Sequence, residues 1–358
     1  MKHTYYAAFI PGLREYIAEI IQERLPDAAI HRLLDGAVIF ETVCSYDKLN
    51  FFCFNNIFAV ISVMEHNKSP GALELHINAA PGLSDQIAAR EVISGNNKKI
   101  SSFRVVVSSE NRPTAVDERL RNDAERFISR LSGLSVNRAA PDTEFWFLYR
   151  SEDNLPAVNG RAAIGLSVFM KRLTLRASWE KSLHPGELPP PLAWMLCHIA
   201  QLRHGNTVLD PFCGYGSIPT AALKCFHIAK FIACDNNREA VAYTKARNKK
   251  RAGESLILHQ AEFNTLPSLV PEKTIDAIVT DPPWGMFREI SDERFYEKMF
   301  MVFYSLLKEE GRAVLLCARQ EEQIIAAAAG FELQKIVPIL LSGKKAAIFQ
   351  FVKKSHFD

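Results

Sequence analysis

Short apolar runs alternate with longer amphipathic segments in the C-terminal half of the chain. The runs predict strands at 207–210, 230–235, 276–281, 312–319, around 334–341 and at 346–352. The segments between them predict helices at 217–226, 238–251, 292–308 and 320–329. Strands that alternate with helices of about ten residues indicate βαβ units and a parallel sheet. The last two strands leave no room for a helix, so we expect an antiparallel hairpin at the sheet edge.

The N-terminal segment mixes strands and helices in another way. Residues 4–10 are β-like, and a Pro-Gly pair then turns the chain. Apolar positions at helical spacing predict a helix over 13–25, and 37–42 is a second expected strand. The segment 46–64 is apolar enough for a buried helix or for a helix followed by a strand, and its pattern favours neither.

Residues 71–155 are expected to form a second unit. Its segment 116–134 predicts a helix that stops at Gly133. Its strands are expected at 103–110 and 144–150, and a further strand is expected at 162–172. A triple proline at 189–191 divides this region from the C-terminal half, because helices rarely cross such a run.

The composition is that of a globular protein of two or three domains. Of the 358 residues, 48% are hydrophobic and 23% charged, and the net charge is +3. No apolar run approaches the ~20 residues that span a bilayer, and the N-terminus has no signal-peptide pattern. The seven cysteines are scattered without a Cys-x-x-Cys pair, which excludes a zinc ribbon and makes disulfides unexpected. We therefore expect a reducing cytoplasm.

Positive charge gathers in two stretches of the N-terminal half. Arg90–Arg138 holds ten basic and six acidic residues, and Arg161–Lys181 holds five and one. Such stretches are typical of phosphate-binding surfaces. The alternative interpretation, a solvated helix face, is equally common for each stretch alone.

A glycine pair follows the first strand of the C-terminal half. Gly214 and Gly216 lie in a strand-to-helix turn, where the backbone approaches a ligand or adopts positive φ. A dinucleotide-binding loop has a third glycine where this chain has Pro219, and the chain has no phosphate-binding P-loop. A tight turn without a ligand is the alternative.

The second strand ends at Asp235, 21 residues after Gly214. A carboxylate at this position accepts hydrogen bonds from the ribose hydroxyls of a nucleoside cofactor bound across the sheet. Asn236 can contact the adenine edge or cap the next helix. The alternative for Asp235 is also a helix cap.

The strand at 276–281 leads directly into Asp281-Pro282-Pro283-Trp284. Consecutive prolines fix φ and remove two N–H donors, which leaves the Asp281 carboxylate and the Pro282 carbonyl as acceptors held in place. Trp284 offers a flat apolar face for stacking. Two acceptors beside an aromatic plate suit the exocyclic amine of a nucleobase. The alternative is a proline pair that only ends a buried strand.

Together LDPFCGYG (209–216), the acidic strand end and DPPW (281–284) resemble the S-adenosylmethionine-dependent amino-methyltransferases, whose fourth motif reads Asp/Asn-Pro-Pro-aromatic. The motifs occur in the right order over 180–358. The whole chain resembles the THUMP-domain RNA methyltransferases that make N2-methylguanosine. Their ferredoxin-like segment resembles YYAAFIPGLREY and DGAVIFET, and HPGELPPPLA resembles the lead into their catalytic domain. Over 71–155 the resemblance rests on order and position.

The resemblance implies a role for each matching residue. The residues that would line the cofactor, from its methionine end to its adenine, are Asp210, Phe212, Gly214, Gly216, Asp235, Asn236, Glu262 and Phe263. The residues that would receive the target base are Asp281, Pro282, Pro283 and Trp284. Glu262 stands where the family usually has Asp, and Trp284 replaces the commoner Tyr or Phe.

The resemblance also implies the fold, an α/β Rossmann-like seven-stranded methyltransferase domain after α+β ferredoxin-like and THUMP-like domains. We expect these at 1–66 (ferredoxin-like), 67–155 (THUMP-like, RNA-binding), 156–180 (linker) and 181–358 (methyltransferase). The implied reaction moves a methyl group from S-adenosylmethionine to the N2 amine of a guanine in tRNA, without a metal or a membrane. The alternatives are an rRNA substrate, a DNA adenine-N6 methyltransferase and a non-catalytic RNA-binding protein.

Overall fold

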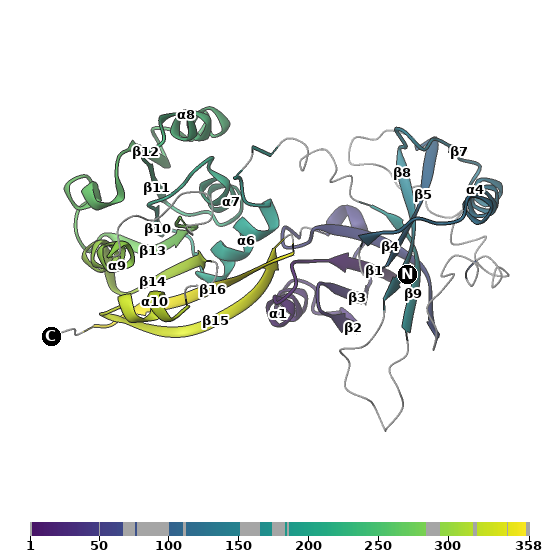
Figure 1. Ribbon diagram of the computed structural model, residues 1–358, viewed down its shortest axis with the longest axis horizontal. Helices are drawn as coiled ribbons and strands as arrows, with labels where there is room; N and C mark the ends of the chain where they lie inside the picture. Colours follow the sequence, from purple (N-terminus) through teal and green to yellow (C-terminus); the bar gives the residue numbers. More distant parts are fainter. Residues whose placement is uncertain are drawn as a thin grey trace, which may run out of the picture. The chain divides into compact units, whose positions relative to one another are not determined.

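The chain divides into two compact units (Figure 1). The first comprises Met1–Ala8, Glu15–Asn50 and Phe54–Ala177, and the second comprises Phe9–Arg14, Phe51–Cys53 and Ser178–Asp358. The boundary at residue 178 lies close to the one expected at 181. The computed structural model describes residues 2–49, 51–66, 76, 100–109, 112–150, 165–173, 183–184, 186–283, 294–317, 321–341 and 343–355.

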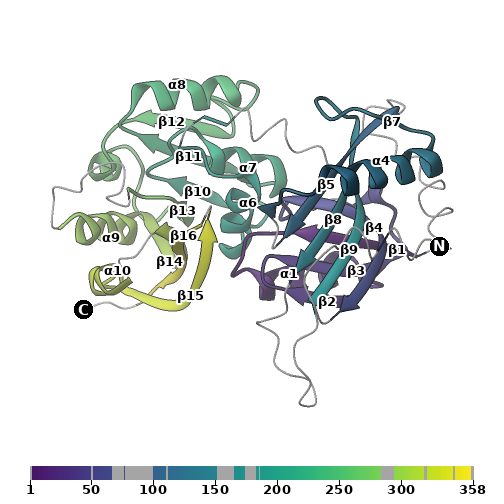
Figure 2. The same ribbon diagram turned by 45° about the vertical axis from the view of Figure 1, so that its right-hand side comes forward.

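A single mixed sheet organises the first unit (Figure 2). Its order among the described residues is β2-β3-β1-β4-β9-β8-β5-β6, with β7 beside β5. The strands are β1 (His3–Ala8), β2 (Ala29–Leu34), β3 (Ala37–Thr42), β4 (Asn56–His66), β5 (Ser102–Ser109), β6 (Arg112–Pro113), β7 (Ser135–Val136), β8 (Thr143–Arg150) and β9 (Gly165–Arg172).

The first four strands resolve a choice that the sequence left open. The segment 46–64 forms a short 3-10 helix, η1 (Tyr46–Lys48), and then β4. Residues 57–61 are all buried because β4 lies between β1 and β9 and is covered on both faces. Helix α1 (Arg14–Arg24) connects β1 to β2 and buries three isoleucines, so the order of elements is β-α-β-β-η-β.

Strand β9 corrects the expected domain boundaries. The expected linker at 156–180 is wrong at its centre, because β9 pairs with both β4 and β8 in the middle of the sheet. Its residues are buried alternately on the two faces. Val168 packs near Tyr6, whereas Phe169 stacks on Phe147 with ring centroids 4.3 Å apart. The expected domains at 1–66 and 67–155 therefore share one continuous sheet.

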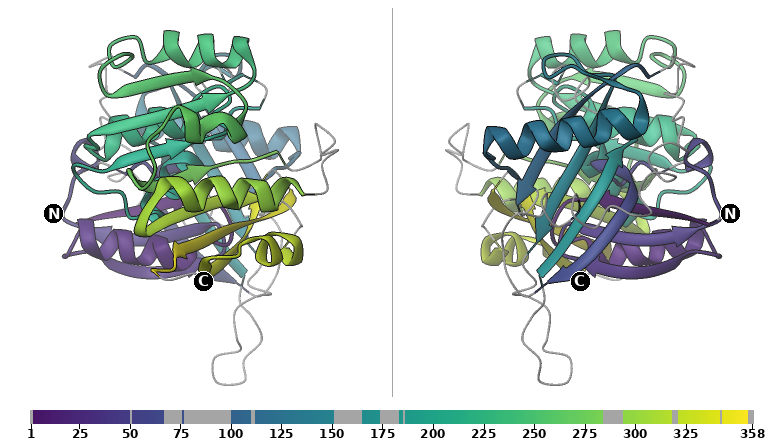
Figure 3. Two further views of the ribbon diagram at one scale, coloured as in Figure 1. Left: turned by 90° about the vertical axis from the view of Figure 1, so that its left-hand side faces the viewer. Right: turned by 90° about the vertical axis from the view of Figure 1, so that its right-hand side faces the viewer.

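Helix α4 (Glu118–Ser132) covers one face of this sheet (Figure 3). Asp117 caps its N-terminus by accepting from the N–H groups of residues 119 and 120. Gly133 ends it in the left-handed conformation at φ 70°, as the sequence predicts. The buried side chains of Phe127 and Ile128 pack on Phe103 and its neighbours.

Two residues of the basic stretch Arg161–Lys181 lie inside the first unit and do not form the expected phosphate surface. Lys171 is only 4% exposed and lies over the ring of Phe145 at 5.7 Å. Arg172 donates to Glu144 Oε2 at 2.8 Å and to Asn56 Oδ1 at 2.7 Å. These two cations stabilise the interior of the first unit and are not available to RNA.

The second unit contains a seven-stranded sheet in the order β12-β11-β10-β13-β14-β16-β15. Strands β10 to β14 are parallel, and β16 is antiparallel to both β14 and β15, which confirms the expected edge hairpin. Strand β12 was not expected from the sequence, because only its first three residues are apolar and it lies at the sheet edge. The bounds are β10 (Thr207–Asp210), β11 (Lys230–Asp235), β12 (Leu256–Gln260), β13 (Ile275–Thr280), β14 (Leu307–Cys317), β15 (Phe331–Leu341) and β16 (Lys344–Lys353).

Helices cover both faces of this sheet, as buried parallel strands require. Met299 and Phe303 of α9 pack with Ile278 and Leu315 on one face, whereas alternate residues such as Val279 are buried on the other. The helices are α6 (Pro190–Ile199), α7 (Ser217–Cys225), α8 (Arg238–Arg247), α9 (Phe295–Leu306) and α10 (Glu321–Ala327), with η3 (Phe263–Ser268) as a 3-10 turn.

The turn at Pro11-Gly12 yields a stability prediction. Gly12 has φ +96°, and an added Cβ would lie 2.0 Å from the carbonyl oxygen of Pro338 in β15. The Leu340 N–H also donates to the Pro11 carbonyl at 3.2 Å, which fixes this contact. Gly12→Ala should therefore lower the free energy of unfolding by more than the ~1–2 kcal/mol that left-handed backbone strain alone costs.

Urea unfolding of Gly12→Ala and Gly253→Ala measures the difference. Gly253 has φ +89°, but nothing lies within 4 Å of its Cβ position, so this control carries strain without a collision. Equal losses in the two variants would contradict the predicted collision.

Candidate active site

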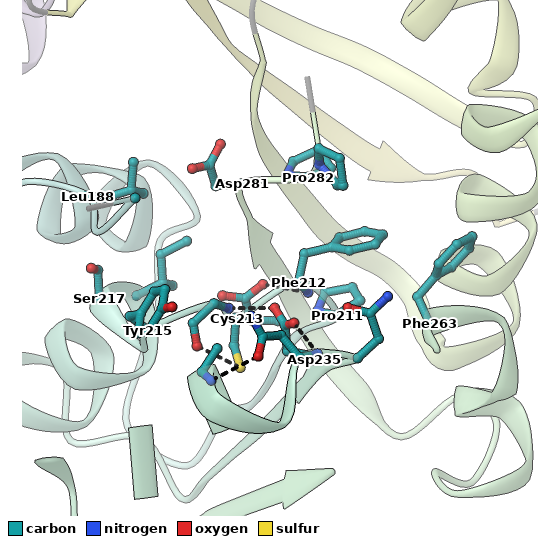
Figure 4. Close-up of a pocket in the computed structure, with 18 of the residues that line it drawn as sticks. Leu188, Pro211, Phe212, Cys213, Tyr215, Ser217, Asp235, Phe263, Asp281 and Pro282 are labelled. Carbon is teal, nitrogen blue, oxygen red and sulfur yellow. Dashed lines mark hydrogen bonds between the residues drawn. The ribbon is translucent and has the colours of Figure 1, made fainter. Parts of the chain in front are cut away.

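A cavity of about 1020 Å³ lies at the carboxyl edge of the parallel sheet in the second unit. The segments that follow β10, β11, β12 and β13 all line it, because the carboxyl ends of parallel strands share one edge (Figure 4). Residues 186–189, α9 and the β15–β16 hairpin complete the wall. The expected site residues on the four strands are thereby brought together.

The glycine loop is held from two sides. The Gly214 N–H donates to Asp235 Oδ2 at 2.8 Å, and Thr244 Oγ1 of α8 donates to the Gly214 carbonyl at 3.0 Å. Gly216 is buried at φ +80°, where a Cβ would lie 2.6 Å from the Thr244 side chain. Gly214 lines the cavity, but Gly216 does not. Gly216 was expected to line the cofactor site, but in the structure it packs against α8. Only glycine lets α8 approach the loop this closely.

Asp235 lies where a ribose acceptor was expected. Its Oδ1 accepts from the Asn237 N–H at 2.9 Å while Oδ2 holds Gly214. The cap of α8 is Asn237, whose side chain accepts from the N–H groups of residues 239 and 240. Asn237, and not Asp235, is therefore the residue that caps α8. A carboxylate has about four lone-pair positions, so Asp235 retains acceptors toward the cavity.

The adenine end of the expected cofactor site is aromatic. Asn236 Nδ2 donates to Glu262 Oε1 at 2.9 Å, which ties the segments after β11 and β12 together. The ring of Phe212 lies 5.2 Å from that of Phe263, and the ring of Phe295 lies 5.3 Å from Phe263. Sequence analysis missed Phe295, because an aromatic residue on an apolar helix face looks like a core residue.

Asp210 is a buried residue of the cavity wall, at 1% exposure. Its Oδ1 accepts from Thr280 Oγ1 at 2.7 Å and from the Phe212 N–H at 3.1 Å. Its Oδ2 is buried without a hydrogen-bond partner among the described residues. Burial raises the pKa of Asp210 to about 7, against the hydrogen bonds from Thr280 and Phe212. This acceptor suits a cationic ligand, whose charge favours the ionised carboxylate.

Asp281 and Pro282 follow β13 and line the cavity together with Pro283. Figure 4 shows Asp281 and Pro282 apart from Asp235, with Phe212 between them. Asp281 is half-buried and Pro282 is buried. Trp284, the fourth expected residue, lies outside the described residues. The cavity thus presents one group of acceptors at the glycine loop and another after β13.

Other lining residues carry no motif that a sequence reading would detect. Tyr215 stacks on His184 with ring centroids 3.6 Å apart, beside the glycine loop. Lys298 of α9 and Lys344 at the start of β16 also line the cavity. Within the described ranges, no three potential metal ligands lie together. A search of the same ranges finds no helix with the length and apolar character to span a membrane.

The second unit is similar to known methyltransferases. Residues 177–337 match the family model described as RMKL-like, methyltransferase domain. The tRNA (guanine(10)-N2)-dimethyltransferase of Methanocaldococcus jannaschii is 27% identical over 164 residues, 41% of this chain and 42% of that protein. The tRNA (guanine(6)-N2)-methyltransferase of Thermus thermophilus is 24% identical over 255 residues, 70% of this chain and 72% of that protein. The chain thus spans less than half of the Methanocaldococcus protein.

The fold of the whole chain also has a solved counterpart. The crystal structure of TrmN from Thermus thermophilus matches with a TM-score of 0.77 at 21% identity, over 99% of this chain and 100% of that one. At this identity the likeness shows the fold alone. Residues 177–337 thus match the RMKL-like methyltransferase model, and the predicted Rossmann-like fold of the second unit is confirmed.

The burial of Asp210 predicts a pH dependence of stability. Its pKa is about 7 in the folded chain and 3.8 ordinarily, so between these pH values the folded state retains a proton that the unfolded state has lost. Asp210 therefore makes the folded chain less stable as pH rises through this window. Asp210→Asn removes the titration, and its stability relative to wild type should rise by up to about 4 kcal/mol between pH 4 and pH 8.

Urea unfolding at several pH values tests this difference without added ligand. The control is Asp123→Asn, which removes an exposed carboxylate paired with Arg126 and should leave the pH profile as in wild type. Parallel profiles for wild type and Asp210→Asn would contradict the predicted titration.

Proposed function

We propose that the chain is an S-adenosylmethionine-dependent RNA methyltransferase that modifies the N2 amine of a guanine in tRNA. The observation that carries the proposal is one cavity that joins a nucleoside-binding loop to the Asp281-Pro282 acceptors. The Methanocaldococcus and Thermus relatives support the base, the atom and the RNA, because each is named a guanine-N2 methyltransferase of tRNA. The methyltransferase domain supports the cofactor.

The residues of the glycine-loop side fit this cofactor. Asp235 offers acceptors to ribose hydroxyls, and the ring of Phe263 offers an apolar wall to adenine. Asp210 provides a buried carboxylate oxygen for the positive charge near the methionine end. S-adenosylmethionine, when bound, supplies an electrophilic methyl group on a sulfonium. No oxyanion develops in this transfer, so the site has no need of an oxyanion hole.

The residues after β13 prepare the nucleophile. The Asp281 carboxylate and the Pro282 carbonyl accept hydrogen bonds from the two protons of the target amine. These bonds return electron density to a nitrogen whose lone pair is delocalised into the guanine ring. Asp281 also holds the proton that the amine loses on methylation. Most of the acceleration then comes from alignment of the amine in a site that excludes water.

The guanine must leave its stack to reach this cavity. A nucleotide in a loop or at a helix end does so at small cost, since its stacking is already incomplete. This favours a structured RNA over duplex DNA as the substrate. An adenine N6 amine would fit the same two acceptors, so the identity of the base needs a direct measurement.

Methyl transfer from labelled S-adenosylmethionine to tRNA, rRNA and duplex DNA tests the proposal, with the product identified by mass spectrometry. N2-methylguanosine in tRNA supports it. N6-methyladenine in DNA, or no transfer to any nucleic acid, would contradict it.

Cofactor binding can be tested by thermal unfolding. S-adenosylhomocysteine at 100 times its Kd should stabilise the folded chain by ~2.7 kcal/mol and raise the melting temperature, whereas NAD and ATP should change it little. Asp235→Ala should abolish this shift, because the ribose hydroxyls lose their acceptor and Gly214 loses its anchor. A full shift in Asp235→Ala would remove Asp235 from the cofactor site.

The role of Asp281 in the reaction can be tested by substitution. Asp281→Ala removes an acceptor that matters most in the transition state, so kcat should fall by about 10²–10³-fold while the melting shift with S-adenosylhomocysteine remains. Asp281→Asn retains a carbonyl acceptor and should lose less. Turnover is measured on samples normalised by folded fraction. Near-normal turnover of Asp281→Ala would show that the segment only ends a strand.

A further inference from the structure

Charge is divided across the wall of the cavity. Its acidic side chains are Glu187, Asp210, Asp235, Glu262 and Asp281. The basic side chains among the described lining residues are Lys298 and Lys344, and both are exposed. No motif points to either lysine, and neither belongs to the expected cofactor set.

The sheet order places Lys344 on the side away from the cofactor loop. The residues expected to bind cofactor follow β10, β11 and β12, which lie on one side of β13. Strands β14, β16 and β15 lie on the other side. Because β16 is antiparallel to β14, its first residue, Lys344, lies at the carboxyl edge where Asp281 follows β13.

Lys298 belongs to the same side of the cavity by chain connection. It lies in the first turn of α9, the helix that connects the Asp281 segment to β14. Lys298 is the basic residue that α9 contributes to the cavity wall.

A polynucleotide needs cations at this mouth for an electrostatic reason. A target guanosine carries a phosphate on each side. Glu187 is paired with Arg247 at 2.7 Å, but the other four carboxyl groups of the wall repel phosphate when they are ionised. The same carboxyl groups favour a cationic cofactor. Two exposed ammonium groups on the target side offset the repulsion where the RNA backbone enters.

We infer that Lys298 and Lys344 bind the phosphates that flank the target guanosine and thereby hold its backbone at the mouth of the cavity. This inference rests on the proposed RNA methyltransferase function. It assigns the RNA contact of the second unit to the side of the sheet formed by β14, β16 and β15. The acidic side, formed by β10, β11 and β12, serves the cofactor.

The β16 strand offers a matched control. Lys345 follows Lys344 and is also exposed, but successive side chains of a strand point to opposite faces, and Lys345 does not line the cavity. The variants are Lys298→Gln, Lys344→Gln and Lys345→Gln, together with Lys344→Arg, which retains the charge. All three positions are at the surface, so the melting temperatures of the four variants should match wild type.

Methyl transfer to tRNA is measured for each variant over a range of salt concentrations. Lys298→Gln and Lys344→Gln should raise KM for RNA several-fold, with kcat at saturating RNA unchanged. Each should reduce the slope of log(kcat/KM) against log salt by about one, because one phosphate contact is lost. Lys345→Gln and Lys344→Arg should behave as wild type, and the S-adenosylhomocysteine melting shift should be the same in all.

Two different results would overturn the inference, and they are distinguishable. If wild type methylates RNA but Lys298→Gln and Lys344→Gln match Lys345→Gln in KM and salt slope, the lysines do not bind the backbone and the proposed function stands. If wild type methylates no RNA, the proposed function fails and the inference fails with it.

Discussion

Parallel strands that end at one edge are the constraint on which this site depends. Asp210, Asp235 and Asp281 are far apart in the sequence, but β10, β11 and β13 are hydrogen-bonded neighbours that run in the same direction. Their final residues must therefore meet. The hydrogen bond from the Gly214 N–H to Asp235 then locks the glycine loop against the second strand. The cavity is thus a consequence of topology, with a few short-range contacts that fix its shape.

The same arrangement places groups that lower the stability of the folded chain at the sheet edge. Asp210 is buried with one oxygen unsatisfied, and Gly216 holds positive φ against Thr244. Neither feature stabilises the chain without a ligand. Groups of this kind are tolerated where they prepare a binding site, because a cationic ligand that contacts Asp210 would stabilise its ionised form. The large apolar core between α9 and the sheet offsets their cost.

The first unit shows how charge in a sequence can mislead about function. Lys171 and Arg172 lie in a basic stretch, but the structure buries both against Phe145, Glu144 and Asn56. Arg138, in the other stretch, pairs with Glu125 through two nitrogens. These cations support the sheet. Lys298 and Lys344 lie in no motif. They are exposed and line the cavity of the second unit, so they are more accessible to a phosphate than Lys171 and Arg172 are.

The sequence by itself determined the elements that local patterns encode. The apolar runs located β10, β11 and β13, the absence of room for a helix predicted the β15–β16 hairpin, and the motifs located the cofactor loop and the Asp281 segment. Strand and helix periodicity depend on neighbouring residues, so they can be read along the chain. Only the tertiary structure decided what depends on distant partners. It placed β9 inside the first sheet, added the edge strand β12, and packed Gly216 against the Thr244 side chain. It also brought Phe295, Lys298 and Lys344 to the cavity, because their roles arise from residues that the chain reaches only after folding.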